Sequence, residues 1–237
     1  MSKKPLPRVL AFDVFGTVVD WHHSIAREVQ ALGLPIDGGE FANAWRARYQ
    51  PSMERVRTGE QPWTRIDDLH RLNLDEVLEA YGDTSLDSAA RDELNLAWHR
   101  LTPWPDTVQG LTELKKLSTI CTLSNGNLAL LSDMAKAGGL PWDLILSAEV
   151  FKHYKPEPEA YLGVCEVFAI EPAQMLMVAA HKNDLRAAAA CGCQTAFIAR
   201  PLEYGAKNPV DTLPEAEFTW NATDFIDLAR QLAASAA

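Results

Sequence analysis

The sequence predicts an α/β protein built on a doubly wound parallel sheet, with an all-helical segment inserted near the start of the chain. Short apolar runs that suit buried strands alternate with stretches of helical periodicity through most of the sequence. That order is typical of a parallel sheet with helices on both faces. Between residues 24 and 99 the pattern is instead almost entirely helical and rich in charge. This interruption predicts a helical insertion.

Composition limits the classes of partner and compartment. With 237 residues, 47% of them hydrophobic, the chain can bury a full core. Its net charge of −10 argues against nucleic-acid and anionic-membrane partners, because phosphate groups select basic patches. A small anionic substrate stays open, since one local cation can outweigh a diffuse negative surface. No stretch is apolar for long enough to span a membrane.

Two further features bear on the compartment. The first seven residues carry charge without a following apolar segment, so we expect no signal peptide. The four cysteines lie in apolar or alanine-rich stretches without paired metal-ligand spacing, which predicts reduced thiols of a cytoplasmic protein. They are Cys121, Cys165, Cys191 and Cys193.

The first expected element is a buried strand at Val9–Phe12, an apolar run too short for a helix. Asp13 follows at its carboxyl end, where open α/β sheets place their ligands. Gly16 permits a sharp turn, and Thr17 supplies a hydroxyl beside the carboxylate. A turn aspartate that merely ends a strand is the plainer interpretation. Because a buried carboxylate is costly unless its charge is used, Asp13 is also a candidate functional group.

The helical insertion comes next. Apolar residues recur at helical spacing over residues 25–32 and 69–81, and a third helix is expected over residues 88–101. We therefore assign residues 19–99 to a helical domain, and residues 1–18 together with 100–237 to the sheet domain.

After residue 103 strands and helices alternate to the end of the chain. The pair Gly138 and Gly139 fits a helix C-cap, and the alanine-rich tail from Ala233 is expected to fray. The expected strands cover residues 119–123, 144–146, 175–178 and 194–198, and the expected helices cover residues 108–117, 128–137, 159–168, 184–191 and 223–232.

Polar side chains follow several of these strands. Since the carboxyl ends of parallel strands meet at one edge of a sheet, we expect these groups to converge. A lysine facing two aspartates would hold the first of them ionised and neutralise part of its charge. Taken singly, each group fits a turn, a loop or a helix N-cap, but their ordered recurrence favours a site. The residues are Asp13, Thr17, Ser124, Asn125, Lys155, His181 and Asp184.

This ordered set resembles the motifs of the haloacid dehalogenase superfamily over nearly the whole chain. The matching stretches are residues 13–17, Ser124-Asn125-Gly126, Lys155-Pro156 and the segment that ends at Asp184. The resemblance implies a Rossmann-like catalytic core, and it makes residues 19–99 the inserted helical cap.

Most members of that superfamily are phosphatases, and this sequence departs from them at two positions. Phe15 stands where a phosphatase of this type carries its general acid, and Ala180 leaves only Asp184 of the acidic pair that helps to hold Mg²⁺. Mg²⁺ prefers several oxygen ligands in octahedral geometry. We therefore expect a reaction without metal or other cofactor, on a substrate whose leaving group needs no proton.

A closer resemblance is to the L-2-haloacid dehalogenases of the superfamily. They carry an aromatic residue at the position of Phe15, a Trp-Arg pair matched by Trp45-Arg46, and a tyrosine placed like Tyr161 after the lysine. Many of them have Ser, Asn and an aromatic residue in the last motif, where this chain has Ala179, His181 and Asn183.

The resemblance implies a two-step hydrolysis of a short 2-haloalkanoic acid. Asp13 attacks the carbon that bears the halogen, and a water activated by Asp184 then hydrolyses the ester. Thr17 and Lys155 complete the catalytic set. The substrate carboxylate is expected to bind the backbone amides after the first strand and the Ser124 hydroxyl, and the halide is expected to bind Arg46, Asn125 and His181. The full set of expected substrate and halide contacts is Val14, Phe15, Arg46, Ser124, Asn125, Tyr161 and His181.

Other interpretations stay open at this point. The chain could be a phosphatase or phosphonate hydrolase with an incomplete metal site, or a binding protein with vestigial chemistry. An arginine on a helix surface is normally solvated, and His181 fits a hydrogen-bonded loop histidine as well as a ligand. A homodimer would follow if the cap exposes an apolar helical face, for which Trp63 and Trp98 are the candidates.

Overall fold

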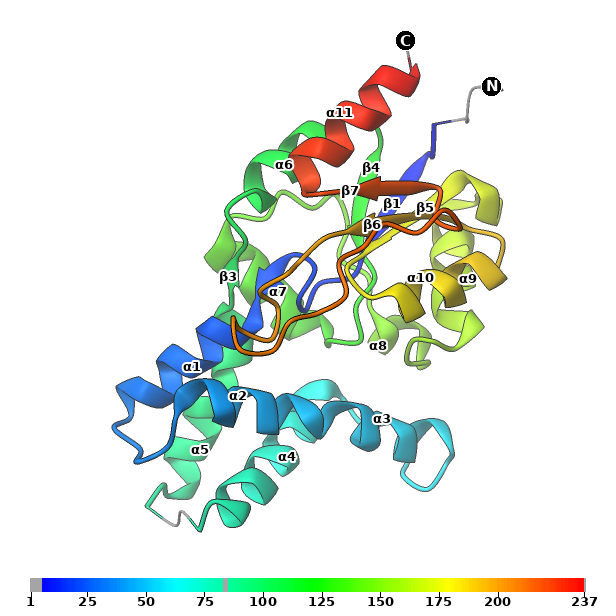
Figure 1. Ribbon diagram of the computed structural model, residues 1–237. Helices are drawn as coiled ribbons and strands as arrows, with labels where there is room; N and C mark the ends of the chain where they lie inside the picture. Colours follow the sequence, from blue (N-terminus) through cyan, green and yellow to red (C-terminus); the bar gives the residue numbers. More distant parts are fainter. Residues whose placement is uncertain (1–5, 83–84, 237) are drawn as a thin grey trace.

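The core is a five-stranded parallel sheet with the strand order β4-β1-β5-β6-β7 (Figure 1). The computed structural model describes residues 6–82 and 85–236, so most of the segment judged for a signal peptide lies outside the described residues. The doubly wound α/β fold is confirmed. The strands are β1 (Val9–Phe12), β4 (Thr119–Thr122), β5 (Met175–Ala179), β6 (Gln194–Ile198) and β7 (Trp220–Ala222).

Helices cover both faces of the sheet. Within β1, Leu10 and Phe12 belong to one apolar cluster and Val9 and Ala11 to the other, as expected for a strand buried on both faces. The first cluster takes in α6 (Thr107–Lys115), α7 (Leu128–Gly138) and α11 (Phe225–Ala236), and the second takes in α9 (Pro158–Phe168) and α10 (Lys182–Ala190).

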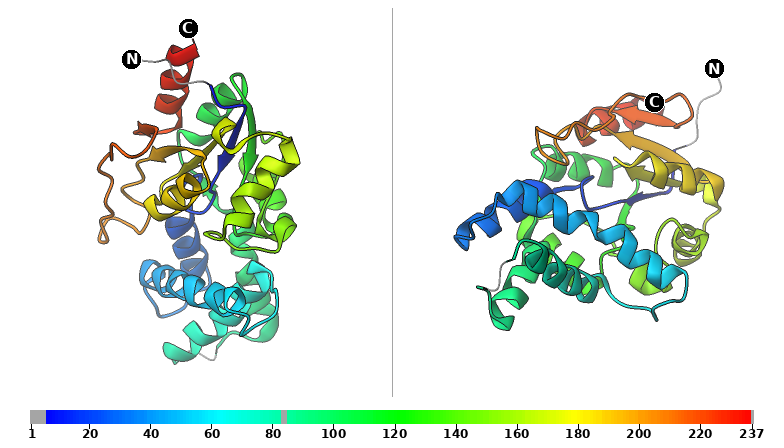
Figure 2. Two further views of the ribbon diagram at one scale, coloured as in Figure 1. Left: turned by 90° about the vertical axis from the view of Figure 1, so that its right-hand side faces the viewer. Right: turned by 60° about the horizontal axis from the view of Figure 1, so that its bottom comes forward.

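The inserted segment is helical and lies at one end of the sheet, as the two further views in Figure 2 also show. A short antiparallel ribbon of β2 (Val19–Asp20) and β3 (Thr102–Pro103) joins the two parts of the chain where it leaves and re-enters the core. We propose this ribbon as the domain boundary, close to the expected limits of 19 and 99. The helices are α1 (Trp21–Ala31), α2 (Gly38–Ala47), α3 (Tyr49–Arg57), α4 (Ile66–Ala80), α5 (Ser88–Asn95) and the 3-10 helix η1 (Leu96–Arg100).

The expected strand over residues 144–146 is wrong. Only single bridges, Cys121 with Leu144 and Ser124 with Ser147, join this segment to the region of β4. The Thr122 hydroxyl donates to the Leu146 carbonyl at 2.6 Å and accepts from the Leu146 amide at 3.0 Å, so at Leu146 a side chain takes the place of a backbone partner. The short helix α8 (Ala148–Phe151) follows directly.

Other differences lie at short or terminal elements. The strand β7 and the 3-10 helix η2 (Pro172–Gln174) were not expected, because a three-residue element has no apolar period to reveal it. The tail expected to fray from Ala233 continues as helix to Ala236.

The two tryptophans expected on an exposed cap face do not form one. Trp98 is completely buried, and the Trp63 ring packs against Tyr154 with ring centroids 4.6 Å apart. Trp98 is therefore wrong as a candidate for an exposed dimer surface, and Trp63 is half-buried. All four cysteines are free thiols, and no helix among the described residues is both long and apolar enough to cross a bilayer.

Candidate active site

The site is centred on the Asp13 carboxylate at the carboxyl end of β1. Oδ1 accepts from Lys155 Nζ at 3.0 Å, and Oδ2 accepts from the Thr17 hydroxyl at 2.7 Å. The Thr17 oxygen in turn accepts from the Ala180 amide at 2.9 Å, which fixes the direction of its proton. Burial raises the pKa of Asp13, but Lys155, His181 and Thr17 outweigh it and hold the pKa well below its usual range. Asp13 is therefore an ionised, oriented carboxylate.

Lys155 is the ammonium that links the two aspartates. Its Nζ also forms an ion pair with Asp184 Oδ2, and the Tyr161 hydroxyl donates to Asp184 Oδ1 at 2.6 Å. Burial alone would lower the pKa of Lys155, yet the two carboxylates raise it, so the ammonium stays charged. Asn125 positions the backbone of this residue, because Asn125 Oδ1 accepts from the Lys155 amide at 2.8 Å.

The cap contributes a cation set among aromatic rings. The Arg46 guanidinium of α2 lies 4.1 Å from the ring centre of Tyr49, 5.6 Å from Trp21 and 5.8 Å from Phe15. Its Nη1 is buried and has no hydrogen-bond partner in the part of the chain that the structure describes. A buried donor of this kind is costly unless a ligand or water satisfies it. Arg46 is thus not the solvated surface arginine of the alternative interpretation.

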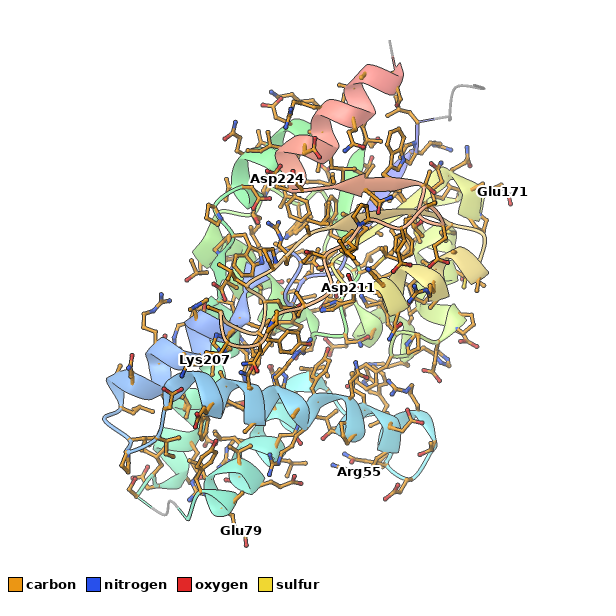
Figure 3. All side chains as sticks on the ribbon, viewed as in Figure 1. Arg55, Glu79, Glu171, Lys207, Asp211 and Asp224 are labelled. Atoms are coloured by element: carbon orange, nitrogen blue, oxygen red, sulfur yellow. The ribbon has the colours of Figure 1, made fainter. Side chains whose placement is uncertain are left out.

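Core and cap together enclose a cavity of about 750 Å³. Asp13, Phe15, Lys155 and His181 line it from the core, and Arg46 and Tyr49 line it from the cap. The loop after β6 closes one side, where Asn43 Nδ2 of α2 donates to the Tyr204 carbonyl at 3.4 Å. Figure 3 places this loop by its labelled residues Lys207 and Asp211. The wall combines charged groups, amide side chains and several aromatic rings, so it offers both orienting polar contacts and apolar surface to a small ligand.

Most predicted site residues come together here, and two lie elsewhere. The Ser124 side chain is fully buried, and its oxygen accepts from the Gly126 amide at 3.1 Å, so it stabilises the loop after β4. The Val14 side chain is buried in the core. The amides of Val14 and Phe15, however, donate to no acceptor within the described ranges, and they follow Asp13 directly.

The structure adds a residue that the sequence did not suggest. Glu203 lies in the loop after β6 and is only 3% exposed, and its Oε1 lies 2.8 Å from His181 Nε2. The other ring nitrogen, His181 Nδ1, lies 3.0 Å from Asp13 Oδ2. No motif marks Glu203, since it follows an ordinary Arg-Pro-Leu segment. Only the fold brings it to the site.

The donor set does not fit Mg²⁺. The Lys155 ammonium lies between the two carboxylates that a metal would bridge, and Ala180 supplies no third oxygen ligand. Within residues 6–82 and 85–236 no three His, Cys, Asp or Glu side chains are grouped as metal ligands.

Comparisons with known proteins find related sequences and similar solved structures. A family model described as haloacid dehalogenase-like hydrolase matches residues 7–192. The (S)-2-haloacid dehalogenase 1 of Pseudomonas sp. (strain CBS-3) is 31% identical over 210 residues, which cover 83% of this chain and 88% of that protein. A phosphoglycolate phosphatase of Neisseria gonorrhoeae is 37% identical over 194 residues, which cover 78% of this chain and 77% of that protein.

Solved structures of L-2-haloacid dehalogenases have a similar fold. A defluorinating L-2-haloacid dehalogenase matches with a TM-score of 0.93 and 47% identity, over 96% of this chain and 95% of that one. The L-2-haloacid dehalogenase of Xanthobacter autotrophicus with chloropropionic acid covalently bound matches with a TM-score of 0.81 and 25% identity, over 96% and 99% of the two chains.

Proposed function

This chain belongs to the haloacid dehalogenase-like hydrolases, and we propose that it hydrolyses short 2-haloalkanoic acids to 2-hydroxy acids and halide. The observation that carries the proposal is the pairing of two features in one cavity. Asp13 is held ionised by Lys155, and the Arg46 guanidinium lines the same cavity from the cap with a buried Nη1 that has no partner among the described residues. The first feature suits a carboxylate nucleophile and the second suits a departing anion.

In the first step Asp13 attacks the carbon that bears the halogen, and an ester forms as halide leaves. Arg46 and the Asn125 amide are the proposed halide contacts, because both line the cavity beside Asp13. The free amides of Val14 and Phe15 are the proposed contacts for the substrate carboxylate. The Phe15 ring forms an apolar wall that keeps bulk water from the ester.

In the second step water attacks the ester carbonyl of Asp13 and frees the 2-hydroxy acid. Two groups flank the ester, Asp184 through the Lys155 ammonium and His181 directly. Lys155 donates to Asp13 Oδ1 and Thr17 to Oδ2, so whichever oxygen remains as the ester carbonyl keeps a donor that stabilises the negative charge developing on it. Tyr161 holds Asp184 in place.

The phosphatase alternative is supported by relatives of that name, but not by the residues of this site. A phosphate ester needs its leaving oxygen protonated and its charge neutralised by metal, whereas Phe15 has no proton to give and Ala180 no oxygen.

The deciding experiment measures halide release from short 2-haloacids beside phosphate release from a panel of phosphate esters. Each assay is run with Mg²⁺ and with EDTA. We expect halide release that EDTA does not change, and no appreciable phosphate release. Mg²⁺-dependent phosphate release without halide would favour the phosphatase. Neither product from any compound would favour a binding protein.

Two finer proposals accompany this function. We propose that fluoride is among the leaving groups, supported by the 47% identity to a defluorinating enzyme. Fluoride release from fluoroacetate tests this proposal.

We also propose the cytoplasm as the compartment, supported by four free thiols. The homodimer stays a prediction that light scattering can check.

A further inference from the structure

His181 lies between two carboxylates and has a ring nitrogen directed at each. Nδ1 is 3.0 Å from Asp13 Oδ2, and Nε2 is 2.8 Å from Glu203 Oε1. A neutral imidazole would set one lone pair against a carboxylate oxygen, so both nitrogens carry a proton in this arrangement. Burial opposes the charge, but Glu203 and Asp13 raise the pKa of His181 well above its ordinary value. The resting enzyme therefore holds an imidazolium.

Glu203 is firmly built into this arrangement. Its Oε1 also accepts from Trp21 Nε1 at 3.2 Å. A side chain at Gly16 would collide with it, since a Cβ there would lie 2.2 Å from Oε1. Charged groups surround His181 on two sides. In the substrate cavity they are Asp13 after β1, Lys155 before α9, Asp184 on α10 and Arg46 on α2; in the second cavity they are Glu203, Arg200 and Asp211 after β6, and Lys182 and Arg186 on α10.

We propose that His181 releases its proton when Asp13 becomes an ester, and that the neutral imidazole is then the base that activates the hydrolytic water. Glu203 is the positioning residue for this histidine. The inference rests on the proposed function, because it requires an ester on Asp13. Its physical cause is simple: esterification removes one of the two negative charges that keep the imidazolium stable.

The position of Asp184 supports this division of roles. One of its oxygens is paired with the Lys155 ammonium, and the other accepts from the Tyr161 hydroxyl. These contacts make it the anchor of Lys155. The sequence-based prediction that Asp184 activates the water is therefore replaced by a proposal for His181. Its Nδ1 lies 3.0 Å from Asp13 Oδ2, one of the two oxygens of the carboxylate that becomes the ester.

Protons and electrons balance over the cycle. In the first step the bond from an Asp13 oxygen to the substrate carbon forms, halide leaves with the electron pair, and His181 loses one proton to solvent. In the second step Nδ1 takes a proton from water as the water oxygen bonds to the Asp13 carbonyl carbon. On collapse, the product oxygen receives that proton from His181. The restored Asp13 carboxyl group then returns its own proton to His181, so each turnover releases one halide and one proton.

A route for the released proton is present. His181 and Glu203 also line a second cavity of about 310 Å³, together with Lys182 and Arg200, and the His181 side chain is 29% exposed. The imidazole thus lies between the substrate cavity and a second one into which its proton can pass.

The first test follows the timing of proton release in the unmodified protein. Enzyme in excess is mixed rapidly with 2-bromopropionate in weakly buffered solution that contains a pH indicator. Halide and covalent ester are measured in parallel by quenching and intact-protein mass spectrometry. We expect one proton per halide in the phase that forms the ester, and no net proton when the ester hydrolyses. Proton release that follows ester hydrolysis would overturn the inference.

The second test uses His181→Asn, with His23→Asn as the matched control because the His23 side chain is 52% exposed on α1. The variant should form the ester and release halide without a proton, and its ester should hydrolyse at least about 100-fold more slowly. The control should behave like the unmodified protein. If the ester of His181→Asn hydrolyses within about threefold of the normal rate, the role of the histidine is refuted. This comparison of variants stays decisive even where ester formation and ester hydrolysis overlap in time in the unmodified enzyme.

The third test addresses Glu203. In Glu203→Gln the imidazole loses its second negative partner, so its pKa in the ester state should fall. Ester hydrolysis needs the neutral imidazole, and the acid limb of its pH profile should therefore move to lower pH, with KM little changed. An unshifted limb would reduce Glu203 to a structural role and contradict the proposal.

The outcomes separate the two proposals. If no haloacid releases halide, the proposed function fails and the inference fails with it. If halide is released and the proton follows ester hydrolysis, only the assignment of His181 fails.

Discussion

At the scale of single residues, the chemistry depends on a carboxylate that its neighbours keep ionised. In Asp13→Asn the amide is nearly isosteric but cannot attack carbon, so halide release should fall by at least about 1000-fold. The fold should survive, because Lys155 keeps its ion pair with Asp184. Halide release and circular dichroism check both statements. Asp92→Asn, on the exposed face of α5, is the control. Turnover by a variant whose mass excludes deamidation would contradict the role of Asp13.

Arg46 owes its role to its planar shape as well as its charge. It packs over the Tyr49 ring and keeps Nη1 unpaired. In Arg46→Lys the charge remains but the planar donor set is lost, so kcat/KM for a chloro acid should fall about tenfold or more. Arg48→Lys is the matched control, since Arg48 is the C-cap residue of the same helix and pairs with Glu76 at the surface. Equal losses in the two variants would argue against a halide contact by Arg46.

At the scale of elements, the turn after β1 must bring the backbone close to Glu203. Gly16 has a φ of 84°, and a Cβ there would lie 2.2 Å from Glu203 Oε1. Gly33, with a φ of 68°, has nothing within 4 Å of such a Cβ. Both Gly→Ala changes should cost about 1 kcal/mol of backbone strain. Only Gly16→Ala should lower the free energy of unfolding further and reduce turnover. Denaturant unfolding and halide assays on both variants compare them, and equal effects would show that the approach of Glu203 is unimportant.

At the scale of the whole molecule, a polar cluster ties the cap to the core. The His99 ring of η1 lies 3.1 Å from Asp67 of α4 and 2.9 Å from Asp133 of α7. Asn127 Nδ2, just before α7, donates to Asp67 Oδ2 at 2.7 Å. Burial lowers the pKa of His99, but the two carboxylates outweigh it and raise the pKa above 6.5. Cap and core are therefore joined by a charged contact as well as by apolar packing.

This cluster makes stability depend on pH with a definite sign. Because the pKa of His99 is raised in the folded state, its stabilisation is complete below the unfolded value of 6.5 and is lost as pH rises through the folded pKa. The destabilisation caused by His99→Gln should thus be largest near pH 5.5 and shrink in alkaline solution. Urea midpoints across this range measure it, with the exposed His23→Gln as control. A difference in urea midpoint between the unmodified protein and His99→Gln that grows with pH would contradict the stabilising role of protonated His99.

Local sequence was sufficient for the groups that sit at strand ends. Asp13, Asn125 and Asp184 each follow a strand of the parallel sheet, which brings such positions to one edge, whereas Lys155 follows the helix α8 and not the strand expected before it. Short continuous apolar runs likewise predicted β1, β4, β5 and β6, since a strand buried on both faces needs such a run. The absence of an acid at Phe15 could also be read directly from the sequence.

Only the tertiary structure decided which groups face each other from distant segments. Glu203 reaches His181 and the Gly16 turn without any motif, because its role depends on where the loop after β6 packs. The burial of Arg46 depends on rings from three separate segments. Near Leu146 the Thr122 hydroxyl makes the contacts that a neighbouring backbone would make in the expected strand. Apolar periodicity reports how a segment is buried, whereas the pairing of polar groups depends on three-dimensional distance, which the order of residues does not encode locally.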